Sequence, residues 1–267
     1  MGARVITITS GKGGVGKTTS TANLAVALAQ LGKRVVCVDA DIGLRNLDVV
    51  MGLENRIVYD LVDVVEGRCG LRQALVRDKR VPQLYLLPAS QTHDKTAVSP
   101  QDMVTLTNQL RADYDVVLID SPAGIEWGFR NALAPADEVI VVTNPEIPAV
   151  RDADRIIGVI EAEERSIAVS VVINRAKPDM IRRGEMMSVA DVLEVLAVTL
   201  LGIVPEDRRV TTASNNGAPL TLADRHAPVS RAFVEIARRL LGEEIPIRDP
   251  AGEGVWLRMA RRLGLGR

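Results

Sequence analysis

Residues 11–18 constrain this chain more than any other part of its sequence. They read Gly-Lys-Gly-Gly-Val-Gly-Lys-Thr and satisfy the pattern G-x-x-x-x-G-K-[ST] at every fixed position. A β-branched run at residues 4–10 precedes them, and residues 18–31 follow with apolar side chains at helical spacing. A strand, a glycine-rich loop and a helix in this order predict a loop whose backbone N–H groups surround phosphate oxygens at a helix N-terminus.

The loop supplies the first set of candidate nucleotide-binding residues. We expect Lys17 to reach the β- and γ-phosphates and the Thr18 hydroxyl to bind Mg²⁺. The simpler alternative is a glycine-rich turn without a ligand, but the required strand and helix are both present and favour nucleotide binding. The candidate residues are Gly11, Lys12, Gly13, Gly14, Val15, Gly16, Lys17, Thr18 and Thr19.

Further short apolar runs alternate with helical stretches along the chain. The pattern predicts helices at residues 150–163, 189–196 and 229–241, among others. Uninterrupted apolar strands that alternate with helices predict an α/β fold, with a mostly parallel twisted sheet and helices on both faces. The further predicted strands are residues 34–39, 84–88, 115–120, 138–143, 168–173 and 201–205.

Two of these strands end in aspartate. Asp39 ends one apolar strand and Asp120 ends another, and carboxylates at the carboxyl ends of parallel strands line the crevice where ligands bind. We expect both to belong to the magnesium site, together with Thr18. Gly124 follows Asp120 closely, and we expect its backbone to lie near the γ-phosphate. An apolar run that ends in Asp is a weak signal alone and gains weight from the phosphate-binding loop.

The charge distribution divides the chain. The formal net charge of the chain is −1. Residues 252–267 carry a net charge of +3, from Arg258, Arg261, Arg262 and Arg267 against Glu253. Residues 1–251 therefore carry a net charge of −4. An acidic body argues against a generally basic nucleic-acid binder, so we expect no specific nucleic-acid partner. The two cysteines cannot build a disulfide scaffold or a cysteine-only metal cage, and we detect no targeting signal or membrane-spanning segment.

The basic C-terminal segment has an amphipathic pattern. On a helical wheel one face collects the apolar residues Val255, Trp256, Leu257, Met259 and Leu263, while Arg258, Arg261 and Arg262 share the other. Such a helix is typical of interfacial membrane binding, and the alternative is a helix that docks on the core. We predict an ATPase domain at residues 1–242, a flexible linker at 243–254 and a membrane-targeting helix at 255–267, because the linker is rich in Pro and Gly.

Lys12 makes the loop more specific. Residues 12–19 resemble the signature K-G-G-x-G-K-[ST]-[ST] of the deviant Walker A family, which includes the ParA partition ATPases and the MinD cell-division regulators. The resemblance implies that Lys12 crosses a dimer interface to the partner's nucleotide. It also implies that Asp41 opens the region called switch I and polarises the attacking water, so Asp41, Lys12 and Lys17 are the predicted catalytic residues.

The resemblance also points to a base pocket. Polar residues follow two later strands and resemble the adenine-contacting segments of the family, although each is an ordinary strand-terminal turn when taken alone. These residues are Asn174, Arg175, Pro205, Glu206 and Asp207.

The resemblance to the MinD branch extends along the chain, through residues 39–48, 87–95, 120–126, 144–146 and 150–155. It implies an ATP- and Mg²⁺-dependent homodimer with slow, partner-stimulated ATP hydrolysis, held reversibly on the cytoplasmic face of the inner membrane by anionic lipids. It further implies recruitment of a MinC-like division inhibitor and control by a MinE-like activator or another topological factor. The alternatives are a ParA-type DNA-partition ATPase, which needs a basic body, and an FlhG-type flagellar-number regulator, which carries an extension before the loop.

Overall fold

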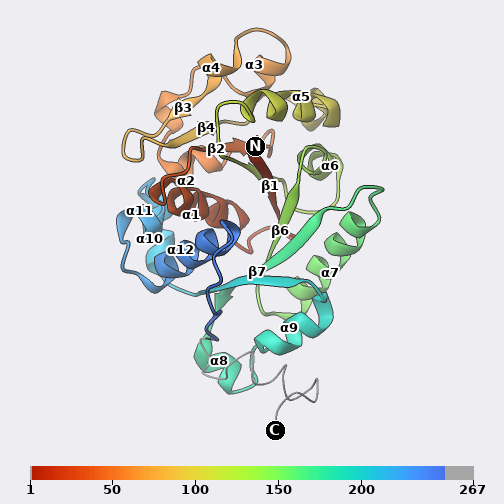
Figure 1. Ribbon diagram of the computed structural model, residues 1–267, viewed down its shortest axis with the longest axis vertical. Helices are drawn as coiled ribbons and strands as arrows, with labels where there is room; N and C mark the ends of the chain where they lie inside the picture. The colour runs from red at the N-terminus through yellow and green to blue at the C-terminus, as the bar shows by residue number, and fades with distance from the viewer. Residues whose placement is uncertain (1, 250–267) are drawn as a thin grey trace.

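A computed structural model describes residues 2–249 and forms one eight-stranded sheet (Figure 1). The strand order is β3-β4-β2-β5-β1-β6-β7-β8, and every neighbouring pair is parallel except β3 with β4. The α/β prediction is therefore confirmed, and the short antiparallel edge was not foreseen. The strands are β1 Arg4–Thr9, β2 Val35–Asp39, β3 Val76–Arg77, β4 Leu84–Leu87, β5 Val116–Asp120, β6 Glu138–Thr143, β7 Ala168–Ala176 and β8 Thr199–Pro205.

Helices cover both faces of the sheet. The predicted helices are confirmed as α1, α7, α9 and α12, and α7 begins before its predicted start because Pro148 is tolerated in the first turn of a helix. The helices are α1 Lys17–Gln30, α2 Leu47–Met51, α3 Leu61–Val65, α4 Leu71–Ala74, α5 Pro100–Leu110, α6 Trp127–Leu133, α7 Ile147–Glu161, α8 Pro178–Arg182, α9 Val189–Leu196, α10 Arg209–Asn215, α11 Leu220–Ala223 and α12 Pro228–Leu240, with 3₁₀ turns at Glu54–Arg56 and Lys95–Ala97.

Alternate residues of the strands face two different sets of helices. In β2, Val35 and Cys37 join the buried cluster that contains α1 and α12, while Val36 and Val38 join the cluster on the opposite face with α5. A third cluster packs α7 and α9 on β6 and β7. Burial on both faces explains why the strands are uninterrupted apolar runs in the sequence.

The parallel arrangement gathers the candidate site at one edge. The carboxyl ends of β1, β2 and β5 lie side by side, and the register pairs Asp39 of β2 with Asp120 of β5. The strand order reverses at β1, because β5 lies on one side of β1 and β6 on the other. Ligands of open α/β sheets bind outside the carboxyl ends of the strands at such a reversal.

The predicted membrane-targeting helix at residues 255–267 and residues 250–254 of the predicted linker lie outside the described residues. Residues 243–249 contain no helix or strand. Among residues 2–249, no helix has the length and apolar character needed to cross a membrane.

Two glycines give matched tests of the packing of this fold. A Cβ on Gly202 of β8 would lie 2.4 Å from Cγ1 of the buried Ile236 of α12, whereas a Cβ on Gly158 of α7 meets nothing within 4 Å. We expect Gly202→Ala to lower the free energy of unfolding by ~1–3 kcal/mol through overpacking. Gly158→Ala should raise it by ~0.5–1 kcal/mol, because alanine is the better helix former. Urea unfolding measures both changes. If the free energies of unfolding of the two variants shift in the same direction, the packing described here is contradicted.

Candidate active site

The glycine-rich loop connects β1 to α1 and turns sharply. Gly14 and Gly16 adopt φ values of +83° and +97°, which side chains other than glycine rarely adopt. A Cβ on Gly16 would lie 2.3 Å from Nδ2 of Asn174, and one on Gly11 would lie 2.4 Å from the backbone of Asp152. Gly13 and Gly14 have nothing within 4 Å of a Cβ, so the middle of the loop is open to a ligand.

Lys17 and Asp120 form a buried ion pair at the foot of this loop. The Lys17 Nζ donates to Asp120 Oδ1 at 2.9 Å, and the side chains are only 7% and 2% exposed. The Thr18 hydroxyl donates to Asp120 Oδ2 at 2.7 Å, and the Thr21 hydroxyl donates to Oδ1 at 2.9 Å. The structure therefore brings the predicted phosphate lysine and two predicted magnesium ligands into direct contact.

These oxygens suit a magnesium ion. Mg²⁺ prefers oxygen ligands and commonly binds one or two carboxylates together with substrate phosphates. Thr18 and Asp120 supply a hydroxyl and a carboxylate side by side. Among residues 2–249, no group of three or more His, Cys, Asp or Glu residues could hold a metal by itself.

Asp39 lies beside this cluster but its contacts are with the backbone. Its Oδ1 accepts the Asp41 N–H at 3.0 Å and its Oδ2 accepts the Leu47 N–H at 3.1 Å. Burial and the nearby Asp120 carboxylate raise the pKa of Asp39 to about 7. Asp39 thus fixes both ends of the loop of residues 41–46, which we call the switch I loop, and its role as a magnesium ligand stays a prediction.

Asp41 begins the switch I loop and is half-buried. Its Oδ1 is buried and has no hydrogen-bond partner among residues 2–249. Burial raises the pKa of Asp41, whereas the positive charges of Lys17 and Lys95 oppose that rise. A carboxylate oxygen with free acceptor capacity near the phosphate lysine is placed to accept a hydrogen bond from a water molecule.

Gly124 and Lys12 flank the loop. The Gly124 N–H donates to the Ser10 carbonyl at 3.0 Å, so this glycine lies against the start of the loop. The Lys12 side chain is half-buried and has no ion-pair partner within residues 2–249. Both positions agree with the expected site, while their contacts with phosphate stay predictions.

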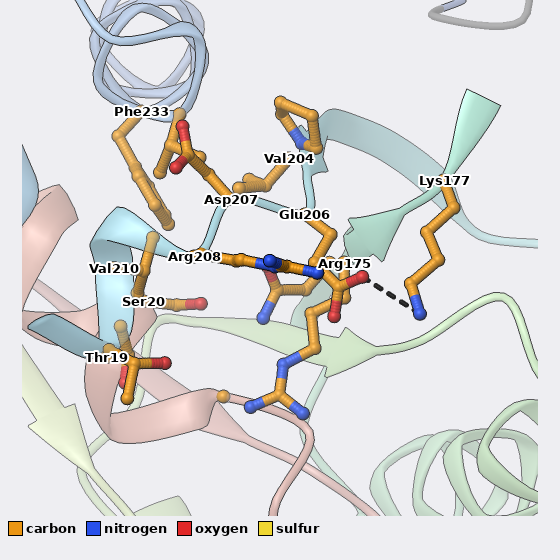
Figure 2. A pocket seen from close by; sticks show the side chains of 15 residues that line it. Thr19, Ser20, Arg175, Lys177, Val204, Glu206, Asp207, Arg208, Val210 and Phe233 are labelled. Atoms are coloured by element: carbon orange, nitrogen blue, oxygen red, sulfur yellow. Dashed lines mark ion pairs between the residues drawn. The ribbon is translucent and has the colours of Figure 1, made fainter. Parts of the chain in front are cut away.

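The predicted base-contacting residues line one cavity of about 440 Å³ beside the loop (Figure 2). Asn174 is buried and its Nδ2 donates to the Val15 carbonyl at 2.8 Å, which ties this wall to the loop. Arg175 adopts a φ of +54°. The predicted residues found in the lining are Gly16, Thr19, Asn174, Arg175, Pro205, Glu206 and Asp207.

Sequence reasoning missed other parts of this wall. Phe233 of α12 lies across from Arg175, and Lys177 pairs with Glu206 at 2.9 Å (Figure 2). Val229 of the same helix also lines the cavity. Phe233 and Val229 carry no signal in the sequence, because their spacing on α12 is that of ordinary core residues. Ser20 also lines the cavity, and its hydroxyl is buried with no hydrogen-bond partner among the described residues.

Comparison with known proteins agrees with this geometry. The family described as the CobQ/CobB/MinD/ParA nucleotide binding domain matches residues 6–220. The septum site-determining protein MinD of Synechocystis is 52% identical over 264 residues, which cover 98% of this chain and 99% of that protein.

Two solved structures share the fold along most of the chain. The MinC:MinD cell division protein complex of Aquifex aeolicus matches with a TM-score of 0.86 and 48% identity, covering 92% of this chain and 99% of that chain. MinD of Pyrococcus horikoshii complexed with Mg-ADP matches with a TM-score of 0.81 and 30% identity, covering 91% of this chain and all of that one (100%). The chain therefore belongs to the CobQ/CobB/MinD/ParA family of nucleotide-binding domains, and within that family to the septum site-determining MinD proteins.

Proposed function

We propose that this protein is an ATPase that dimerises around ATP, attaches to the inner membrane through its C-terminal segment, and positions the division site by recruiting a division inhibitor. The observation that carries the proposal is the buried cluster of Lys17, Thr18 and Asp120 at the foot of an open glycine-rich loop. The relatives named septum site-determining protein and the solved MinC:MinD complex support the choice of pathway.

The residues of the site divide the chemistry among them. The backbone of the glycine-rich loop and Lys17 bind the phosphates, and Asn174, Arg175 and residues 205–207 surround the base. Thr18 and Asp120 would hold Mg²⁺, which would neutralise negative charge on the phosphates. Asp41 orients the attacking water, and its elevated pKa makes it a stronger acceptor than an exposed carboxylate. Hydrolysis is slow until a partner protein completes this arrangement.

The edge that carries the site is also suited to a second copy of the chain. Leu44 is 60% exposed in the switch I loop, Trp127 is 44% exposed after β5, and Ile147 is 60% exposed after β6. These apolar side chains follow the carboxyl ends of β2, β5 and β6, on both sides of β1 and of the loop that holds Lys12. Burial of this edge between two subunits would cover them and bring Lys12 to the partner's nucleotide.

Dimerisation explains how C-terminal segments that each bind weakly can attach the protein to the membrane. Each Arg near an anionic leaflet contributes about 1 kcal/mol, and a buried large apolar side chain contributes ~1.5–3 kcal/mol. Ordering a short helix opposes binding by ~1–2 kcal/mol per residue, so one tail binds weakly. Two tails in one dimer gain a factor of ~10²–10⁴ from effective concentration, and ATP therefore controls membrane attachment.

The two loop lysines should separate nucleotide binding from dimerisation. Lys17→Ala removes the main cation on the phosphates and leaves Asp120 without its buried partner, so ATP affinity should fall by two orders of magnitude or more, on the order of 3 kcal/mol. Lys12→Ala should keep ATP affinity within about tenfold but lose the ATP-dependent dimer. Calorimetric titration with ATP and gel filtration in ATP test both. A Lys12→Ala variant that still dimerises with ATP would remove its role across the interface.

Asp41 should be needed for hydrolysis but not for assembly. Its loss removes a contact with the attacking water and leaves ground-state phosphate contacts in place. Asp41→Ala should reduce phosphate release by ~10²-fold or more while the ATP-dependent dimer persists. Asp39→Ala serves as a control, because it releases both ends of the switch I loop and should weaken dimerisation as well. Wild-type turnover by Asp41→Ala would exclude its catalytic role.

Membrane attachment should depend on ATP and on the apolar face of the tail. We expect the wild type to sediment with anionic vesicles in ATP and not in ADP, and not to bind duplex DNA at physiological salt, because its body is acidic. Trp256→Gln should weaken vesicle binding at least tenfold, since each tail of the dimer loses a large apolar contact of ~1.5–3 kcal/mol. Leu265→Gln, on the polar side of the wheel, is the matched control. ATP-dependent binding to DNA rather than to vesicles would favour the ParA-type function.

A further inference from the structure

Two glycines far apart in the sequence bring their backbones into direct contact. Gly52 ends α2 with a φ of +64°, and Gly217 follows α10 with a φ of +60°. A Cβ on Gly52 would lie 2.3 Å from the Gly217 carbonyl oxygen, and a Cβ on Gly217 would lie 2.6 Å from the Gly52 Cα. Any side chain at either position would therefore push the two main chains apart.

One arginine ties the same two chain segments together. Arg80, in the turn between β3 and β4, donates from Nη1 to the Gly217 carbonyl at 2.9 Å and from Nη2 to the Met51 carbonyl. The buried carboxylate of Asp78 orients the guanidinium, accepting from Nε at 3.1 Å and from Nη2 at 2.8 Å. A guanidinium can hold three groups in one plane because its N–H donors have a fixed geometry. We call this arrangement of Arg80, Gly52 and Gly217 the α2–α10 clamp.

The clamp connects the two ends of the nucleotide site. The N-terminus of α2, opposite the clamp, directly follows the switch I loop, and the Leu47 N–H there donates to Asp39. The N-terminus of α10, also opposite the clamp, directly follows residues 205–208, and Val210 and Thr211 of its first turn line the cavity. Each helix has only five or seven residues, so a shift at one end reaches the clamp through one or two helical turns.

We propose that the α2–α10 clamp positions the switch I loop according to whether the base end of the cavity is filled, with Arg80 as its positioning residue. This inference rests on the proposed binding of a nucleotide in the cavity. A base that packs against Val210 and Thr211 restrains the first turn of α10. The clamp transmits that restraint to α2. Together with Asp39, α2 then fixes the loop that carries Asp41. Arg80 does not line the cavity and acts only through these backbones.

Hydrogen exchange of α2 gives a direct test, because two ligands separate the base from the phosphates. Mg-pyrophosphate fills the glycine-rich loop alone, whereas Mg-ADP also fills the base end, and neither carries a γ-phosphate. In the wild type we expect ADP to slow exchange of the amides of residues 47–53 on the order of fivefold or more beyond the effect of pyrophosphate, the usual size of coupling between linked sites.

The variants break the clamp from two directions. Arg80→Gln removes the shared donors, and Gly217→Ala forces the two backbones apart, so either should abolish the additional slowing by ADP. Arg72→Gln is the matched control for the arginine, because Arg72 pairs with Asp113 on the surface away from the cavity. Gly67→Ala is the control for the glycine, because Gly67 has a φ of +72° but nothing within 4 Å of a Cβ.

The readouts distinguish failure of the inference from failure of the proposed function. Calorimetric titration should show ADP binding to the wild type and to all four variants, and urea unfolding checks that each variant folds. If the wild type binds ADP and α2 exchanges equally in ADP and pyrophosphate, the inference is wrong while nucleotide binding stands. Retention of the ADP effect in Arg80→Gln and Gly217→Ala would also overturn it. If the wild type does not bind ADP, the proposed function and the inference both fail.

Discussion

The ion pair between Lys17 and Asp120 is the interaction on which the rest of the site depends. Two buried charges must recover their lost hydration from one another and from added hydrogen bonds. Here the hydroxyls of Thr18 and Thr21 supply those bonds to the Asp120 carboxylate. This links β5 to the glycine-rich loop and to the first turn of α1, so the phosphate site and the centre of the sheet form one unit.

Placing a second carboxylate beside this pair has a cost. Asp39 is the register partner of Asp120 on the neighbouring strand, and its pKa rises to about 7 because burial and the second carboxylate both disfavour its charged form. Two backbone N–H groups of the switch I region lower that pKa in part by stabilising the charged form. The position of the switch I loop is therefore coupled to the ionisation of Asp39. A cation that enters the site would favour the charged form of Asp39 and so strengthen its hydrogen bonds from these two N–H groups.

The sequence predicts what is local and periodic. The strands other than β3, the helices α1, α7, α9 and α12, and the glycine-rich loop follow from apolar runs and one spaced motif, and the structure confirms them. Helix α5 could have been found from its capping box, in which Ser99 and Asp102 bond each other's backbones. The segments predicted to contact the base were identified by family resemblance, and they do line the cavity. Phe233 could not have been found, because a cavity-lining aromatic and a core aromatic look the same on one helix.

The parts that escape prediction are those that depend on contacts between distant segments. Gly52 and Gly217 each read as the glycine that ends a short helix, and their mutual approach is visible only after the sheet has placed α2 beside α10. Arg80 reads as a turn residue in an edge hairpin, yet it holds two carbonyls that belong to neither of its strands. Such contacts join the switch I loop to the helix whose first turn lines the cavity. A nucleotide bound in this cavity would act on the switch I loop from both of its ends, because the short helices α2 and α10 provide a path of packed backbone between them.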